Sequence, residues 1–368
     1  MNNNANTRNP AMDVIRCFAL LSVVSFHFFL NNGFYDTVVD CPRMYIMVAM
    51  RTFFMICVPL FLVLSGYLMK NKKPNGKYYS KLFYTVGIYV LASIACAAFK
   101  FVKSPEAFSP MGAIWGIFNF TTANYSWYVE MYIGLFLLIP FLNLIYNNLE
   151  TQKQKLWLLG TMLILTAVPS VLNSFQFLNF QWWLQPSTSI NYDYIFPDHW
   201  VSVYPITYYF TGCYLREYPI KISPLKNAFC ILLTFATIGV YAIYRSYGAA
   251  PLYDSWSGHG SLLTVIQTVL VFNFFANLKY NKIGEKGGKF LAYISKLTLG
   301  AYLCSWIFDE VFYKILNSNV SDMHKRLDYF IIIVPAVYIC SLLLSAVLNW
   351  IYNIISKICT SVFKKKTA

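Results

Sequence analysis

Charge is scarce in this sequence, and negative charge is scarcest. Only 12% of the 368 residues are charged, and the 29 lysines and arginines outnumber the 15 acidic residues. Soluble domains carry about 25% charged residues, so this composition, with 58% hydrophobic residues, excludes an ordinary soluble domain. Together with a mean hydropathy of +0.50, it predicts a polytopic membrane protein.

Cysteine motifs are absent as well. The nine cysteines include no CxxC pair and no other spacing typical of a metal site. Most of them fall within apolar runs, where cysteine usually behaves as a small hydrophobic residue. We therefore expect neither a disulfide framework nor a bound metal. The formal charge of +14 does not indicate nucleic-acid binding, because the basic residues stand in short loops between apolar runs and not on one folded face.

Long apolar runs are what the sequence has in abundance. A polar tail, 1–10, precedes the first of them without a small-residue cleavage site, so we expect an uncleaved first helix. The pattern predicts an all-α protein of about ten transmembrane helices in one membrane domain, 1–368, that ends in a basic tail, 357–368. The predicted spans are residues 11–31, 46–69, 82–102, 127–146, 156–172, 201–216, 227–247, 261–278, 290–313 and 329–356.

Lysine and arginine also predict the orientation. If residues 1–10 are cytoplasmic, the inner loops hold about 19 of these residues and the outer loops about 8. Both termini should therefore be cytoplasmic. The longest outer loop, 173–200, holds neither lysine nor arginine but many aromatic residues, which suit either an anchor at the membrane interface or a wall that binds sugar.

The first predicted span carries charge where a membrane helix should have none. At about 100° per residue, Asp13, Arg16 and His27 fall on one stripe, which must therefore face protein or water. Histidine suits a general base, and arginine suits an anionic ligand. The residue types alone leave a second interpretation open, in which Asp13 and Arg16 form a structural ion pair and His27 is a core histidine.

This stripe resembles a known signature. The arrangement Arg-x-x-Ala-x-x-x-Val-x-x-x-His, with Asp13 three residues ahead, is similar to that of the acyltransferase-3 family, membrane proteins that acylate sugars and related acceptors. Many relatives have a histidine after the Tyr-Leu of the ninth span, where this chain has Cys304 and Ser305. Weaker matches follow in the family's order over nearly the whole chain, at CVPLFLVLSGYL (57–68), SWYVEMYIGLFLLIP (126–140), YFTGCYL (209–215) and LTLGAYLCS (297–305).

The resemblance implies a membrane O-acyltransferase, with acetyl as the expected acyl group. It would move that group from cytoplasmic acetyl-CoA, or another acyl-CoA, to a hydroxyl of an extracytoplasmic glycan or lipid-linked sugar of a bacterial cell envelope. His27 would be the general base or a transient acyl carrier. Arg16, supported by Asp13, would orient the donor or stabilise charge on the thioester oxygen.

The resemblance and the residue types themselves indicate further candidate site residues. Glu130, where relatives commonly have an uncharged residue, would be an extra partner for a cation in the site or would lie at the membrane interface. Gly66 would either let two helices pack closely or leave room for a thin ligand arm. We expect the outer histidines, His199, His259 and His324, to be non-catalytic residues of the surface or the membrane interface, and His259 is the most plausible contact for the acceptor among them. The substrate site would be lined by Ser65, Tyr67, Trp127 and Tyr128.

A basic loop joins the second and third predicted spans. Its lysines suit two roles that do not exclude each other, anchoring to anionic lipid and holding the phosphates of coenzyme A. We call them the loop lysines, and they are Lys70, Lys72, Lys73, Lys77 and Lys81.

A transporter of a small polar solute is the alternative function, with Asp13, Arg16 and His27 lining its path. Transporters often show internal repeats, and this sequence has no evident one. A purely structural scaffold fits poorly with charges on one stripe of a span. The partners that we expect are membrane lipid, acyl-CoA and the acceptor in a bacterial plasma membrane, with no nucleic acid; homo-oligomerisation stays open.

Overall fold

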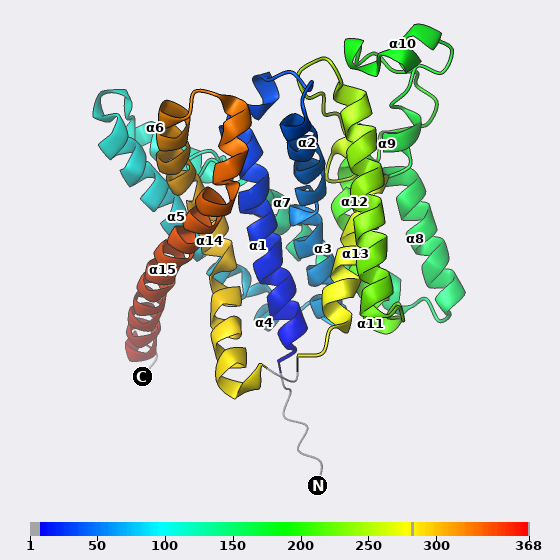
Figure 1. Cartoon of the computed structure of the whole chain (residues 1–368). Coiled ribbons are helices and arrows are strands. Elements are labelled where there is room, and N and C mark those ends of the chain that lie inside the picture. Colours follow the sequence, from blue (N-terminus) through cyan, green and yellow to red (C-terminus); the bar gives the residue numbers. More distant parts are fainter. Residues whose placement is uncertain (1–7, 281–282, 367–368) are drawn as a thin grey trace.

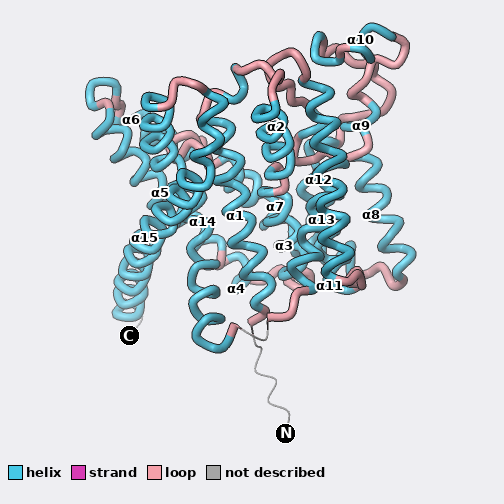
Figure 2. The backbone as a smooth tube through the Cα atoms, in the orientation of Figure 1, coloured by secondary structure: helices cyan, strands magenta, loops and turns pink. Residues whose placement is uncertain are grey.

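The computed structural model describes residues 8–280 and 283–366. Within these residues the chain is helical, and its one β-bridge, between Val39 and Tyr247, belongs to no strand. Figures 1 and 2 show most helices running side by side between two ends of the molecule. The all-α prediction is confirmed.

Long helices form the bundle, and short helices and turns connect them. The bundle consists of α1 (Pro10–Asn31), α2 (Pro42–Phe54), α3 (Cys57–Met69), α5 (Leu82–Lys103), α7 (Trp127–Asn147), α8 (Gln152–Thr166), α11 (Tyr204–Glu217), α12 (Pro224–Ser246), α13 (Leu262–Asn277), α14 (Gly284–Asn319) and α15 (Phe330–Lys366). The connections include α4 (Gly76–Tyr79), α6 (Pro110–Phe118), α9 (Pro169–Leu172), α10 (Phe180–Leu184) and the 3-10 turns η1 (Phe34–Asp36), η2 (Pro105–Ala107), η3 (Pro186–Thr188), η4 (Val201–Val203), η5 (Ser255–Ser257) and η6 (Met323–Tyr329).

Nine helical segments of the described chain are long and apolar enough to span a membrane. They match nine of the ten predicted spans. The sixth predicted span, 201–216, is α11, whose 14 residues are too few for a hydrocarbon core of about 30 Å at about 1.5 Å per residue. The second predicted span is two helices, because α2 ends at Phe54 and α3 begins at Cys57.

Helix α1 lies within the bundle and contacts α14, α3, α15, α2 and α13. Pro10 occupies its first turn, and the side chain of Asn9 accepts a hydrogen bond from the main-chain nitrogen of Ala11, so the start of the helix is capped. Its buried residues include Asp13 and His27 as well as apolar side chains. The polar stripe of the first span therefore faces protein.

Helices α3 and α11 approach each other closely at two glycines. A Cβ on Gly66 would lie 1.9 Å from the carbonyl oxygen of Tyr209, and a Cβ on Gly212 would lie 2.0 Å from that of Val63. No side chain fits at either position. Of the two interpretations of Gly66, the structure supports close helix packing.

Gly212→Ala is expected to destabilise the protein by about 1–3 kcal/mol, because α3 and α11 must separate or distort to admit the methyl group. The matched control is Gly134→Ala on α7, where an added Cβ meets nothing within 4 Å and alanine favours the helix. Thermal unfolding of both variants in detergent measures the difference. Equal unfolding midpoints would contradict the close contact.

We name the two ends of the bundle after residues of α1. The Arg16 end, at the bottom of Figure 1, holds the start of α1 and the end of α15, and the His27 end, at the top, holds α6 and α10. Arg16 and His27 are about 16 Å apart along the helix axis at about 1.5 Å per residue. The start of α1 and the end of α15 thus lie at the same end of the bundle, and the assignment of that end to the cytoplasm stays a prediction.

Candidate active site

The carboxylate of Asp13 is bound mainly by Arg8, which the sequence did not indicate as a site residue. This buried carboxylate accepts hydrogen bonds from Arg8 Nε at 2.7 Å and Arg8 Nη2 at 2.5 Å, whereas Arg16 Nη1 lies 3.8 Å away. The hydrogen bond to Asp13 raises the pKa of the Arg8 guanidinium. Arg16 instead donates to Ser295 Oγ on α14 at 2.9 Å. The charge of Arg16 is therefore largely left for a ligand.

A cavity of about 280 Å³ opens beside Arg16, between α1, α3, α5, α7 and α14. Three predicted site residues line it, namely Arg16, Ser65 and Tyr128. Most of the remaining wall is apolar or aromatic, so the cavity suits a thin chain that carries a polar group near Arg16. The other lining residues are Phe61, Leu64, Leu68, Met69, Thr85, Tyr132, Thr298, Leu299 and Tyr302.

A wider cavity of about 620 Å³ adjoins the first and shares Arg16, Thr298 and Leu299 with it. Its wall is more polar and includes the exposed Lys296 of α14 and Asn349 of α15. The cavity lies between α14 and α15, which diverge toward the Arg16 end in Figure 1. A cation beside amide groups suits an anionic ligand.

His27 lies in a buried polar cluster. Its Nδ1 is 3.2 Å from Oδ2 of Asp309 on α14, and the two side chains are 8% and 1% exposed. The same oxygen accepts a hydrogen bond from the Tyr125 hydroxyl at 2.9 Å. The Tyr125 ring packs on the imidazole, with 3.9 Å between ring centroids. Nδ1 and Oδ2 are close, but their geometry does not meet the criteria for a hydrogen bond. Catalytic hydrogen bonds are often long or poorly aligned when no substrate is bound.

Two tyrosines connect the Arg16 cavity with His27. Tyr302 lines that cavity, and its hydroxyl donates to the main-chain carbonyl of Tyr125. The Tyr125 ring in turn covers the imidazole. Tyr302 and Tyr125 therefore form a chain of contacts between the wall of the Arg16 cavity and His27.

Three other predicted site residues lie away from the Arg16 cavity. Tyr67 packs on Phe272 of α13, with 5.5 Å between ring centroids. Glu130 is exposed on α7, where it faces away from the cavity that Tyr128 lines. Trp127 stacks on His259, with 5.6 Å between ring centroids. Trp127, expected to line the substrate site, and His259 are thus brought together at the start of α7.

The loop lysines do not form one cluster. Lys70 pairs with Glu217 of α11 at 3.1 Å, and Lys155 pairs with the same carboxylate at 2.7 Å, so the charge of Lys70 is partly balanced within the protein. Lys72 and Lys73 line a pocket of about 320 Å³ with asparagines of α7. The other two loop lysines are exposed. Lys72 and Lys73 are therefore the best placed of the five for an anionic ligand.

A pocket of about 440 Å³ opens at the His27 end between α5, α6 and α14. Trp306 and Glu310, which stand close to Asp309 in α14, line it, and Lys103 pairs with Glu310. The Lys100 ammonium lies 5.0 Å from the centroid of the Trp306 ring. The other lining residues are Ser104, Ala107, Phe108, Ser109, Gly112, Ala113, Thr121 and Thr122. Donors and acceptors beside an aromatic ring suit a ligand with several hydroxyl groups.

The aromatic residues of loop 173–200 pack in part on a buried cation. Arg245 of α12 is fully buried, and its guanidinium carbon lies 5.1 Å from the ring centroids of both Trp182 and Tyr192. It also donates to the Tyr192 hydroxyl at 2.7 Å. The buried Trp182 and the half-buried Tyr192 thus hold the loop on α12.

Sequence reasoning missed Arg8, Tyr125 and Asp309. Asp309 falls within the ninth predicted span, where an acidic residue is the same signal that singled out Asp13. Arg8 and Tyr125 lie outside the predicted spans, and no local pattern shows that they meet a buried carboxylate.

The model of the acyltransferase domain family matches residues 9–350. The match covers nearly the whole chain and includes Arg16, His27 and Asp309. Comparison with curated proteins and with solved structures finds no match.

Proposed function

The chain belongs to the acyltransferase family. We propose that it is a membrane O-acyltransferase that takes an acetyl group from cytoplasmic acetyl-CoA. The acceptor is a hydroxyl of a glycan or a lipid-linked sugar on the opposite side of a bacterial plasma membrane. One observation carries the proposal: the cavity beside Arg16 is lined by Tyr302, which bonds to the main chain of Tyr125, and the Tyr125 ring packs on a buried histidine that faces a carboxylate.

His27 is the general base in this proposal. Because Nδ1 faces Asp309, Nε2 is the nitrogen that takes the proton of the acceptor hydroxyl. The hydroxyl oxygen then bonds to the thioester carbonyl carbon, the carbon–sulfur bond breaks, and the proton passes from His27 to the departing thiolate of coenzyme A. Asp309 stabilises the imidazolium that exists between these proton transfers.

In this proposal acetyl-CoA binds at the Arg16 end. The narrow cavity suits a pantetheine arm, and Arg16 in its wall would orient the thioester or balance charge on its oxygen. The nucleotide phosphates would lie nearer the cytoplasm, beside Lys296 or beside Lys72 and Lys73. An arm that starts at Arg16 must cover about 16 Å to reach His27.

In this proposal the sugar acceptor binds at the His27 end. The pocket that Trp306 and Glu310 line is next to Asp309 and offers both donors and acceptors of hydrogen bonds. A sugar unit of the acceptor fits this chemistry. The count of lysines and arginines supports the division, because it assigns the Arg16 end to the cytoplasm.

Arg16→Lys is expected to lower kcat/KM for acetyl-CoA by about 10²-fold, because an ammonium cannot replace the planar, two-pronged guanidinium. The matched control is Arg43→Lys, since Arg43 pairs with Asp328 at 2.8 Å and touches neither Arg16 cavity. Steady-state release of coenzyme A from acetyl-CoA measures both variants. Full activity of Arg16→Lys would mean that Arg16 is structural.

Lys296→Ala is expected to raise the KM for acetyl-CoA about tenfold, the loss of one hydrogen bond to a charged group. Lys77→Ala is the control, because Lys77 is an exposed loop lysine. The KM values come from the same release assay. An unchanged KM for Lys296→Ala, with an increase for Lys72→Ala and Lys73→Ala, would place the phosphates at the loop instead.

The function itself is tested with radiolabelled acetyl-CoA and purified protein in nanodiscs, supplied with membrane sugars as acceptors. Transfer of label to a sugar by the wild type, and its absence with His27→Ala, supports the proposal. Folded wild-type protein that neither binds nor turns over acetyl-CoA contradicts it.

A further inference from the structure

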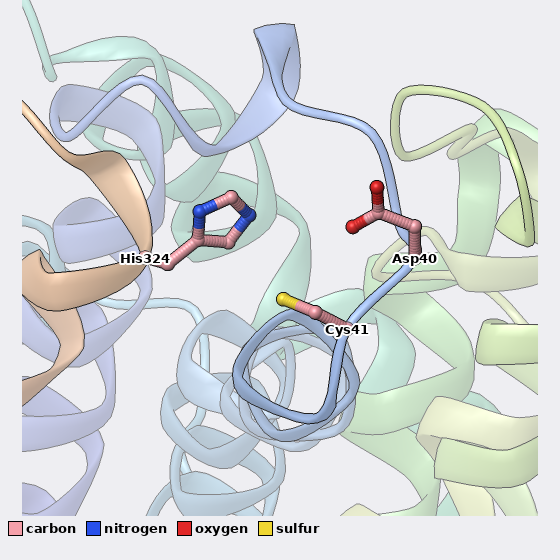
Figure 3. Close-up of side chains that lie close together, drawn as sticks. All are labelled: Asp40, Cys41 and His324. Carbon is pink, nitrogen blue, oxygen red and sulfur yellow. The ribbon is translucent and has the colours of Figure 1, made fainter.

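Three metal-ligating side chains meet at the His27 end, outside the site described above. Asp40 and Cys41 precede α2, and His324 lies in η6, between α14 and α15. Their ligand atoms all lie within 4.8 Å of one another. Figure 3 shows the three side chains pointing into one space. Cysteine spacing could not reveal this group, because its histidine comes from the opposite end of the sequence.

The imidazole of His324 is held with one nitrogen toward that space. Nδ1 lies 3.2 Å from Oδ1 of Asp322, and a carboxylate in that position favours the proton on Nδ1. Nε2 then carries the lone pair, is buried and has no hydrogen-bond partner in the described chain. Figure 3 shows it turned toward Cys41 and Asp40. An unpaired buried nitrogen is costly, and a bound ion would remove that cost.

Acidic groups stand around the three ligands. Asp40 and Asp322 are acidic, with Lys325 Nζ 3.8 Å from Oδ2 of Asp322, and a cysteine that binds a metal does so as a thiolate. Arg43 lies nearby and donates to the main-chain carbonyl of His324 at 3.1 Å, but its charge is paired with Asp328 at 2.8 Å. The repulsion from Arg43 is therefore reduced.

We propose that Asp40, Cys41 and His324 bind a zinc ion. One sulfur, one imidazole nitrogen and one carboxylate oxygen are the ligand types of Zn²⁺, whereas Ca²⁺ and Mg²⁺ take oxygen ligands. Water fills the fourth tetrahedral position. Tetrahedral bonds of about 2.0–2.3 Å set the ligand atoms about 3.5 Å apart, so the ion draws the loop before α2 toward η6.

The ion stabilises the C-terminal end of α1. Arg326 of η6 donates to the main-chain carbonyl of Asn32 at 2.6 Å, and Asn317 of α14 donates to that of Asn31 at 2.8 Å. His27 lies about one helical turn before Asn31. A zinc ion that fixes η6 therefore steadies the end of α1 and takes no part in the reaction.

The first measurement is metal binding by the full-length chain in detergent. Protein stripped with EDTA is titrated with Zn²⁺ and, separately, with Co²⁺, whose thiolate complex absorbs in the near ultraviolet. We expect one equivalent of Zn²⁺, a cobalt–thiolate band and a higher unfolding temperature with metal. Asp322→Asn, which keeps the shape of the side chain, should weaken binding about 10–100-fold.

Cys41→Ser should abolish the cobalt–thiolate band, and His324→Ala should weaken Zn²⁺ binding by at least about 10²-fold. Cys359→Ser is the matched control, because Cys359 is an exposed cysteine of α15 outside the group. Folded wild-type protein that binds neither ion saturably overturns the proposal, as does binding that Cys41→Ser and Asp322→Asn leave unchanged. No acyl-CoA is present, so the result is independent of the proposed transfer reaction.

Discussion

His27→Ala is expected to lower the rate of acyl transfer by about 10³-fold, because a positioned general base contributes about 10²–10⁴-fold. The KM for acetyl-CoA should change little, since the donor cavity is lined by Arg16 and not by His27. The variant should still fold, because Asp309 keeps its hydrogen bond from Tyr125. Label transfer from radiolabelled acetyl-CoA to sugar, measured in nanodiscs, gives the rate.

The control for this variant is His199→Ala, which changes an exposed histidine of the loop 173–200. It should transfer label at the wild-type rate. Normal product from folded His27→Ala would remove His27 from the mechanism. Label that stays on His27 of the wild type in the absence of acceptor would make this residue a transient acyl carrier instead of a base.

The fold was predictable because a membrane helix is specified by a local property. About 20 consecutive apolar residues identify a span wherever its neighbours lie, and nine long helices are where the hydropathy places them. Helix α11 departs from the prediction, because the turn η4 occupies the start of the predicted span and leaves only 14 helical residues, from Tyr204 to Glu217.

The stripe on α1 was predictable for a similar reason. Helical periodicity fixes which residues of one helix share a face, and burial of Asp13 and His27 agrees with it. Periodicity also explains a difference within α3. Ser65 and Tyr67 are two positions apart, about 200° around the helix, so Ser65 lines the cavity while Tyr67 packs on α13.

What the sequence could not supply is the pairing of distant residues. Asp309 meets His27 only because α14 packs along α1, and hydropathy does not say which helices are neighbours. The same holds for Lys70, which pairs with Glu217 of α11. The number of lysines in the loop can be read from the sequence, but the fold determines which of these lysines remain available to bind a ligand.

Asp309→Asn is expected to lower kcat by about 10²–10⁴-fold and to leave the KM for acetyl-CoA nearly unchanged. The amide keeps the shape of the carboxylate and can still accept the hydrogen bond from Tyr125, so the buried cluster should persist. It lacks the negative charge that stabilises the imidazolium of His27, and its NH₂ group favours the wrong tautomer of the ring. Asp309 is therefore a positioning residue whose loss should appear in kcat.

Two further variants separate this role from a purely structural one. Tyr125→Phe removes one hydrogen bond to Asp309 but leaves its charge, so kcat should fall only about fivefold, roughly the value of one hydrogen bond. Glu285→Gln, at the exposed start of α14, should behave as the wild type. A fall in the unfolding temperature of Asp309→Asn with kcat retained would show that the carboxylate serves the fold alone, because an electrostatic role must lower kcat even in fully folded protein.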